Sequence, residues 1–166
     1  MMVENPLPSF RFIVTLLPGD AYLPPTQAAL LPLVAAGEFM EVKGLGADLE
    51  VTAYPEGGVN DHVHQLPVRH SWGRISLRRG VVRDGGLLWS WYVAGLIQSP
   101  GARRDGSIIL MTSAGTPAMS WTFHAGLAAK WVGPELNAMQ NAVAIEALDI
   151  AHEGLVAVLL SAPGTP

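Results

Sequence analysis

Apolar and polar residues alternate along most of this chain, and the alternation predicts short β-strands. Strands are expected at residues 10–17, 39–45, 49–54, 72–82, 105–112 and 117–124. Gly44 and Gly46 mark a bend between the second and third of these segments, and residues 113–116 form a turn that joins the last two into a hairpin. Many short strands of this kind predict a mainly β fold, a β-barrel or an orthogonal antiparallel sandwich.

One segment, residues 85–99, has the periodicity of a helix. Its apolar stripe consists of Leu88, Trp91, Tyr92 and Leu96. Asp84 can cap the start, and Ser99-Pro100-Gly101 ends the pattern. The helix has no charged residue and is apolar on most sides, so we expect it to flank the β-structure and to pack against a second subunit.

The sequence pattern does not decide the structure of two regions. Residues 121–154 read as short apolar runs broken at Gly126, at Gly133-Pro134 and in the polar turn at 137–141. From Val143 onward the pattern fits either a strand or a helix. The uncharged segment 21–37 contains three prolines and cannot be one long helix. It is expected either to cover its own barrel or to dock on a neighbouring component.

The region from 121 to 154 also carries a resemblance. It reads W-T-F-H-A-G-L-A-A-K-W-V-G-P-E-L-N-A, then N-A-V-A-I-E-A-L-D-I-A-H-E-G. This resembles the C-terminal signature of the tail-tube proteins of contractile phages and phage-tail-like injection systems, W-N-F-x-N-A-x-P-x-K-W-x-G-P-x-L-N-A and N-x-V-A-I-E-x-L-E-L-A-H-E-G. The signature positions here are Trp121, Lys130, Trp131, Gly133, Pro134, Leu136, Asn137, Glu146, His152 and Glu153.

The resemblance implies a structural subunit of an inner tube, related in fold to the haemolysin-coregulated protein of type VI secretion. Such subunits form stacked six-fold rings whose sheets join into one barrel around a lumen for cargo or DNA. A sheath and a baseplate or spike are the implied partners. A specialised tube-initiator ring, which joins the tube to the spike and baseplate, is the alternative, and the apolar segment 21–37 slightly favours it.

The resemblance also covers residues 55–67, which are similar to a family segment Y-R-E-G-G-x-N-x-x-x-x-x-L-P. It implies a long hairpin or loop that reaches the adjacent ring. The positions assigned to ring stacking are Glu56, Gly57, Gly58, Asn60 and Asp61. Together these features predict a single domain over residues 1–166, with an apolar insertion at about 18–38 and a loose tail at 161–166.

Composition supports self-assembly. Of the 166 residues, 49% are hydrophobic and 14% are charged, which is well below the roughly 25% typical of soluble domains. So few charges cover an isolated subunit poorly, so part of its surface is expected to be buried against other copies. The net charge of -4 argues against specific reading of nucleic acid. No apolar run is long enough for membrane insertion, and the start lacks a secretion signal, so synthesis in the cytoplasm is expected.

No catalytic set or cofactor site is expected. The chain has no cysteine and lacks G-x-S-x-G. Asp61, His62, His64 and His70 are a weak candidate for a metal-dependent enzyme, because nothing fixes the ligand geometry. Arg78 and Arg79 are expected to pair with acids on a neighbouring chain. A monomeric ligand-binding β-barrel with an apolar pocket is the alternative from another functional class.

Overall fold

The computed structural model describes residues 7, 11–17, 34–36, 39–58, 61–81, 86–97 and 103–160. Its strands are β1 (Phe12–Leu16), β2 (Val34–Ala36), β3 (Phe39–Lys43), β4 (Ala47–Tyr54), β5 (His64–Trp72), β6 (Ile75–Gly80), β7 (Arg104–Met111), β8 (Pro117–Val132), β9 (Ile145–Ala151) and β10 (Gly154–Leu159), and its helix is α2 (Leu87–Ile97). The predicted mainly β fold is confirmed, and within the described residues helix α2 flanks the sheets. Asn60, Asp84, the helix stop at 99–101, the tail at 161–166 and most of the insertion at 18–38 lie outside the described residues.

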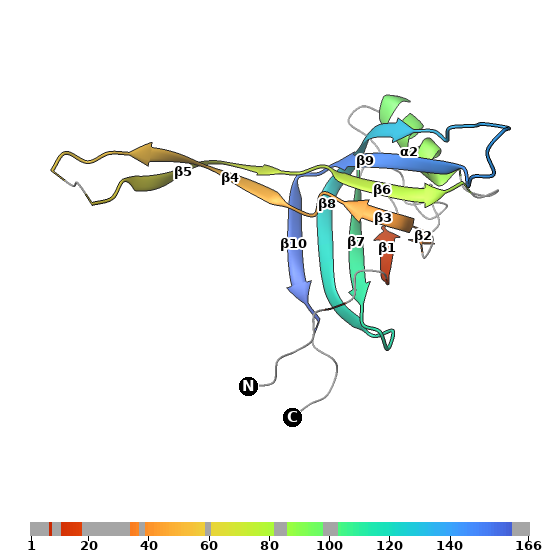
Figure 1. The fold of residues 1–166 in the computed structure, drawn as a ribbon, viewed down its shortest axis with the longest axis horizontal. Coiled ribbons are helices and arrows are strands. Elements are labelled where there is room, and N and C mark those ends of the chain that lie inside the picture. Colours follow the sequence, from red (N-terminus) through yellow and green to blue (C-terminus); the bar gives the residue numbers. More distant parts are fainter. Residues whose placement is uncertain are drawn as a thin grey trace.

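The strands form two antiparallel layers that cross at a steep angle and share β8 (Figure 1). The path runs β2-β1-β7-β8-β9-β6-β3, and β10 pairs with β8 on the side away from β7. The first half of β8 pairs with β7 and β10, and its second half pairs with β9. Because one strand serves both layers, the two sheets are covalently continuous and pack as an orthogonal sandwich.

A bend inside β8 makes this possible, and it corrects the prediction that Gly126 ends a strand. Ala125 has a φ of 50°, and the β7–β8 register shifts between Arg104 and Gly106. A Cβ at Gly106 or Gly126 would lie 2.5 Å or 2.6 Å from the ring of Phe123. The two glycines therefore make room for that ring, and the strand turns a corner where the sequence suggested a break.

The core lies between the two layers and under the helix. Its buried side chains are Val14, Leu16, Phe39, Ile75, Leu77, Leu88, Trp91, Ile108, Phe123, Ala128, Leu148 and Ile150. Helix α2 contributes two of them and packs on β8. The open question after Val143 is resolved as two strands, β9 and β10. The buried core side chains form one apolar cluster, against which Trp121, Trp131 and Leu155 also pack.

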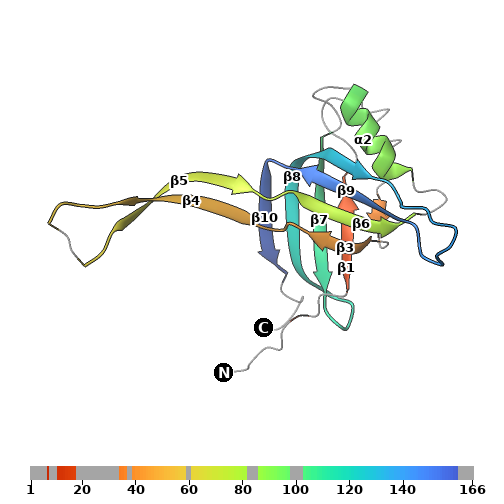
Figure 2. The same ribbon diagram turned by 45° about the horizontal axis from the view of Figure 1, so that its top comes forward.

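The β4–β5 hairpin extends far from this body (Figure 2). Strand β4 follows β3, and β5 precedes β6, so the hairpin continues two strands of one layer into solvent. All residues of β4, and all of β5 except Trp72, are exposed. The loop predicted at 55–67 is shorter than expected, because His64–Pro67 belong to β5. An isolated two-stranded hairpin is only marginally stable in water, so contact with another surface would stabilise this one.

Candidate assembly surfaces

The projecting hairpin has one apolar face and one mainly polar face. Directly opposed residues in an antiparallel pair place their side chains on the same face. One face carries the pairs Ala47–Trp72, Leu49–His70, Val51–Pro67 and Ala53–Gln65. The other face carries the pairs Asp48–Ser71, Glu50–Arg69, Thr52–Leu66 and Tyr54–His64. A register shift makes Val68 an extra residue between the two halves of β5. We call the first set the apolar ribbon face. At its base Trp72 contacts the ring of His152 on the body, with centroids 5.9 Å apart.

Two of the proposed stacking residues, Glu56 and Asp61, belong to a small polar cluster at the tip of the hairpin. The ring nitrogens of His62 and His64 lie 3.0 Å from the carboxylates of Asp61 and Glu56, respectively. The two imidazole rings pack edge to face, with centroids 5.0 Å apart. His70 lies farther along β5 against Trp72. No group of three or more potential ligands within the described ranges is arranged to hold a metal, so the metal-site hypothesis is not supported.

The exposed side of helix α2 is narrower than the sequence predicted. Leu88 and Trp91 are fully buried in the chain's own core, and Tyr92 packs against that core. These three therefore hold the helix to its own subunit, and only Leu96 of the predicted stripe is exposed. Ile97 and half-exposed Trp89 lie beside it on the outer side. Within the described part of the helix, these three side chains form its exposed apolar side.

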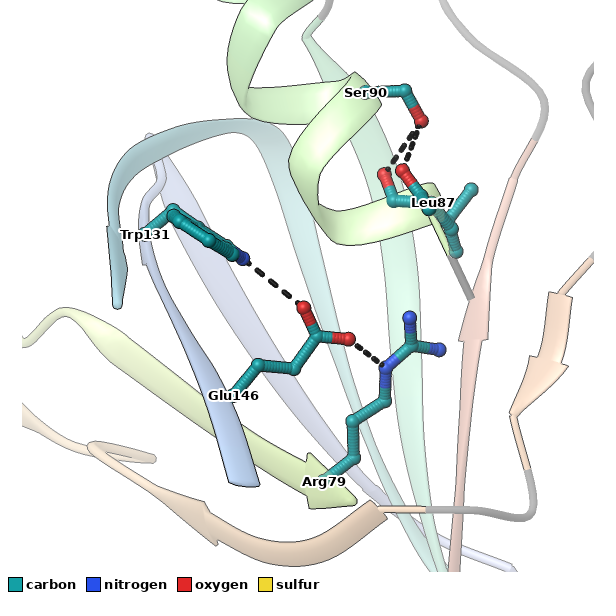
Figure 3. A network of polar contacts seen from close by, with 6 residues as sticks. Arg79, Leu87, Ser90, Trp131 and Glu146 are labelled. Carbon is teal, nitrogen blue, oxygen red and sulfur yellow. Dashed lines mark hydrogen bonds and ion pairs between the residues drawn. The ribbon is translucent and has the colours of Figure 1, made fainter. Parts of the chain in front are cut away.

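A buried ion pair anchors the segment between β8 and β9 (Figure 3). Arg79 Nε donates to Glu146 Oε1 at 2.8 Å, and Trp131 Nε1 donates to Glu146 Oε2 at 3.1 Å. Arg79 is 3% exposed and Glu146 is 5% exposed. The predicted pairing of Arg79 with a neighbouring chain is therefore wrong. Arg78 likewise bonds Glu41 of its own chain at 3.0 Å.

These contacts determine the shape of the loop at residues 133–144. A Cβ at Gly133 would lie 2.7 Å from the indole of Trp131, so only glycine fits beside that ring. Asn137 accepts bonds from the backbone N–H of Met139 at 2.9 Å and of Gln140 at 3.2 Å, which makes a local turn. The turn presents Leu136 and Met139, which are 84% and 93% exposed. An ordered loop that holds large apolar side chains in solvent is typical of an interface.

An open groove runs along the base of this loop. It has a volume of about 840 Å³ and is lined by Arg78, Val132, Glu135, Leu136, Val143 and Ile145, among others. A smaller hollow of about 250 Å³ lies at Met40 and Glu41 on the same layer. Lys43 lies 2.6 Å from the carboxylate of Glu41. The hydrogen bond from Lys43, and then that from Arg78, lowers the pKa of Glu41.

Strand β10 leaves one edge without a partner strand among the described residues. Its sequence, G-L-V-A-V-L, contains no charge, and Val156, Val158 and Leu159 are exposed. Natural edge strands normally carry charges, prolines or bulges that prevent uncontrolled pairing. This edge has none of these features, so pairing with another chain is the simplest explanation. The sequence reasoning did not identify this edge.

One buried cation lies under the helix. The guanidinium of Arg104 is 5.5 Å from the ring centroid of Trp91, and burial lowers the pKa of the side chain. Within the part of the chain that the structure describes, its Nε and Nη1 are buried without a hydrogen-bond partner. Its neighbour Arg103 pairs with Glu153 at 2.6 Å and donates to the carbonyl of Ala125 at 3.1 Å. These contacts hold the corner at which β8 bends.

Nine of the ten signature positions divide into two groups, and the tenth, Pro134, is half-buried at the start of the loop after β8. Trp121, Trp131, Gly133, Asn137, Glu146, His152 and Glu153 have roles inside the subunit, in packing, turns or ion pairs. His152, for example, donates from Nδ1 to the carbonyl of Gly154 at 3.0 Å. Lys130 and Leu136 are exposed, and among the described residues neither makes a side-chain hydrogen bond or ion pair. Their role is expected in assembly.

The model of the family described as "T4-like virus tail tube protein gp19" matches residues 8–156. Among curated protein sequences, no similar protein matches the chain. No helix within the described parts of the chain is long and apolar enough to cross a membrane.

Solved structures share the fold. The sheath-tube complex of an extracellular contractile injection system, PVC, contains a chain with a TM-score of 0.74 and 24% identity, covering 95% of each chain. A chain in the sheath/tube terminator complex of the same system has a TM-score of 0.73 and 25% sequence identity, and the match covers 95% of this chain and 99% of that chain. Hcp1 from Flavobacterium johnsoniae has a TM-score of 0.52 and 14% sequence identity, and the match covers 89% of this chain and 94% of that chain.

Proposed function

We propose, on the premise that this chain belongs to the family of the T4-like virus tail tube protein gp19, that it is the repeated structural subunit of the inner tube of a contractile injection system. The family consists of structural tail tube proteins, not enzymes. The observation that carries the proposal is the match to this family over residues 8–156, supported by the fold shared with the tube complexes. The apolar segment 21–37, which favoured an initiator ring, lies largely outside the described residues.

The subunits close as a ring of six through the sheet that ends in β10. One edge of this sheet is β10 and the opposite edge is β2. When one sheet edge meets a different edge of the next copy, the contact is heterologous and closes into a ring if the rotation allows it. Closure would cover the uncharged β10 edge and remove the free edges that promote aggregation. A baseplate among the similar structures is described as six-fold symmetrised.

Rings then stack into a tube, and the projecting hairpin is the feature suited to reach beyond one ring. Its tip residues Glu56, Gly57, Gly58 and Asp61 lie at the far end of the molecule (Figure 1). The tube would enclose a lumen for cargo or DNA, and a sheath and a baseplate would be its partners. The support for these partners is that the similar chains belong to sheath-tube, baseplate and terminator complexes.

The β10 edge offers a direct test of ring closure. Leu160 donates its N–H to the carbonyl of Ala118, so alternation directs the N–H groups of Val156 and Val158 toward β8 and that of Ala157 toward the free edge. Ala157→Pro should remove only an outward donor and block pairing with a second copy. The control Val158→Pro removes a donor inside the subunit.

The expected result is a six-subunit species for the wild type and a folded single subunit for Ala157→Pro, measured by native mass spectrometry and circular dichroism. Val158→Pro is expected to lower the midpoint of thermal unfolding by several degrees more than Ala157→Pro does. An Ala157→Pro protein that still forms six-subunit rings would contradict closure through β10.

A further inference from the structure

The loop between β8 and β9 and the apolar ribbon face of the hairpin both expose apolar side chains. We propose that residues 133–144 of one copy bind the apolar ribbon face of a second copy, near Leu49 and Val51. This inference rests on the proposed function and specifies which parts of two subunits meet. It assigns a role to two surfaces that have no cover within the described part of the subunit.

The ribbon side of this contact carries no Asp, Glu, Lys or Arg, and its polar side chains are Gln65 and His70. Leu49 and Val51 are 58% and 52% exposed, and Ala47, Ala53 and Pro67 lie on the same face. The charged residues Asp48, Glu50 and Arg69 all lie on the opposite face. A partner of apolar chemistry can therefore cover this face without burying an unpaired Asp, Glu, Lys or Arg.

The loop side is an apolar projection held in a fixed shape. Leu136 and Met139 extend from the Asn137 turn, and Glu135 is the only charged residue between positions 133 and 144. Both stems of the loop are anchored: Trp131 bonds Glu146, and Val81 donates to the carbonyl of Ala144 at 2.9 Å. An anchored loop loses little conformational entropy when it binds, which favours its use as a contact surface.

The two surfaces lie at opposite ends of the molecule. In both views the hairpin extends from one side of the body and the loop at 133–144 from the other (Figures 1 and 2). One subunit cannot join its own two surfaces, but head-to-tail neighbours can. Such a contact uses different surfaces on the two copies and is repeated by every subunit, as a ring or a tube requires.

The natural chain has no cysteine, so a disulfide can be placed cleanly across the contact. We would compare Leu49→Cys/Leu136→Cys with the control Glu50→Cys/Leu136→Cys, which moves one thiol to the polar face. Both hairpin positions are exposed, so folding should be preserved, and the single-cysteine variants give the background. Assembled particles are oxidised, or treated with a short bis-maleimide, and analysed on denaturing gels, and electron microscopy of the same samples records rings and tubes.

The expected result is a ladder of covalent multimers for Leu49→Cys/Leu136→Cys, with at least a tenfold lower yield for the control pair. A ladder that stops at six chains places the contact within a ring, and a longer ladder places it between rings; both support the proposal. Assembled particles that give no ladder, or equal yields for the two pairs, would overturn the proposed contact and leave the tube function intact. The absence of rings and tubes from all samples would instead overturn the proposed function.

Discussion

Removing the Glu146 carboxylate should cost the subunit much of its stability. In Glu146→Leu the buried Arg79 guanidinium loses its carboxylate, and the Trp131 indole N–H loses its acceptor. Breaking a buried ion pair from one side costs about 3–5 kcal/mol, and leaving a buried donor unpaired costs about 1–3 kcal/mol. We therefore expect a loss of at least about 4 kcal/mol, a large part of the roughly 5–15 kcal/mol available to a domain.

Two further variants separate charge from packing. Glu146→Gln keeps an acceptor oxygen but removes the charge, so we expect a smaller loss of about 1.5–3 kcal/mol. Arg79→Met/Glu146→Leu removes both charges, and the paired replacement of buried ions by apolar side chains is often nearly neutral. This double variant should recover most of the loss seen in Glu146→Leu, although Trp131 still lacks its acceptor.

The assay is equilibrium unfolding in urea at a protein concentration at which mass measurements show single subunits. The slope of the free energy against urea should stay constant, so that shifts of the midpoint report stability alone. The reasoning would be refuted if Glu146→Leu lost less than about 1 kcal/mol of unfolding free energy. It would also be refuted if the loss in the double variant equalled the sum of the losses in Arg79→Met and Glu146→Leu alone.

Three other predictions concern single sites. Gly133→Ala should destabilise the subunit by about 1–3 kcal/mol, because the new Cβ meets the Trp131 ring at 2.7 Å, whereas the control Gly57→Ala, with no atom within 4 Å, should be near neutral in the same urea assay. Arg104→Met should raise the free energy of unfolding by about 1 kcal/mol, because removing two buried donors without partners among the described residues gains more free energy than the lost cation–π contact with Trp91 costs. A large destabilisation would contradict this. For Glu41, the folded-state pKa is lowered by Lys43 and then by Arg78, so its contribution is present above the ordinary value of 4.5 and is lost as the pH falls through the lowered pKa. Glu41→Gln should therefore melt below the wild type at pH 7 and low salt, and the two melting temperatures should converge at acidic pH and in high salt.

Much of the fold is local in origin and could be predicted. The strands and the helix follow from alternation and helical spacing, because side-chain periodicity reports which face each element buries. The same alternation indicates that Arg79 is buried. Arg79 shares a strand face with Ile75 and Leu77, and Glu146 shares one with Leu148 and Ile150. Two opposite charges at buried positions were the signal for an internal ion pair.

Other features depend on tertiary contacts that no local pattern contains. The bend in β8 exists because the Phe123 ring fills the space over two glycines on different strands. The unpaired edge of β10 depends on strand order, which periodicity does not specify. In the same way, Leu88 and Trp91 look like an interface stripe in sequence, yet the helix uses them to pack on its own body.

The measurement that tests the central claim most directly is electron microscopy of the purified protein, with its mass measured in solution. The account predicts six-subunit rings that stack into hollow tubes, with long stacks if this is the repeated tube subunit. A monodisperse single subunit at high concentration would contradict it.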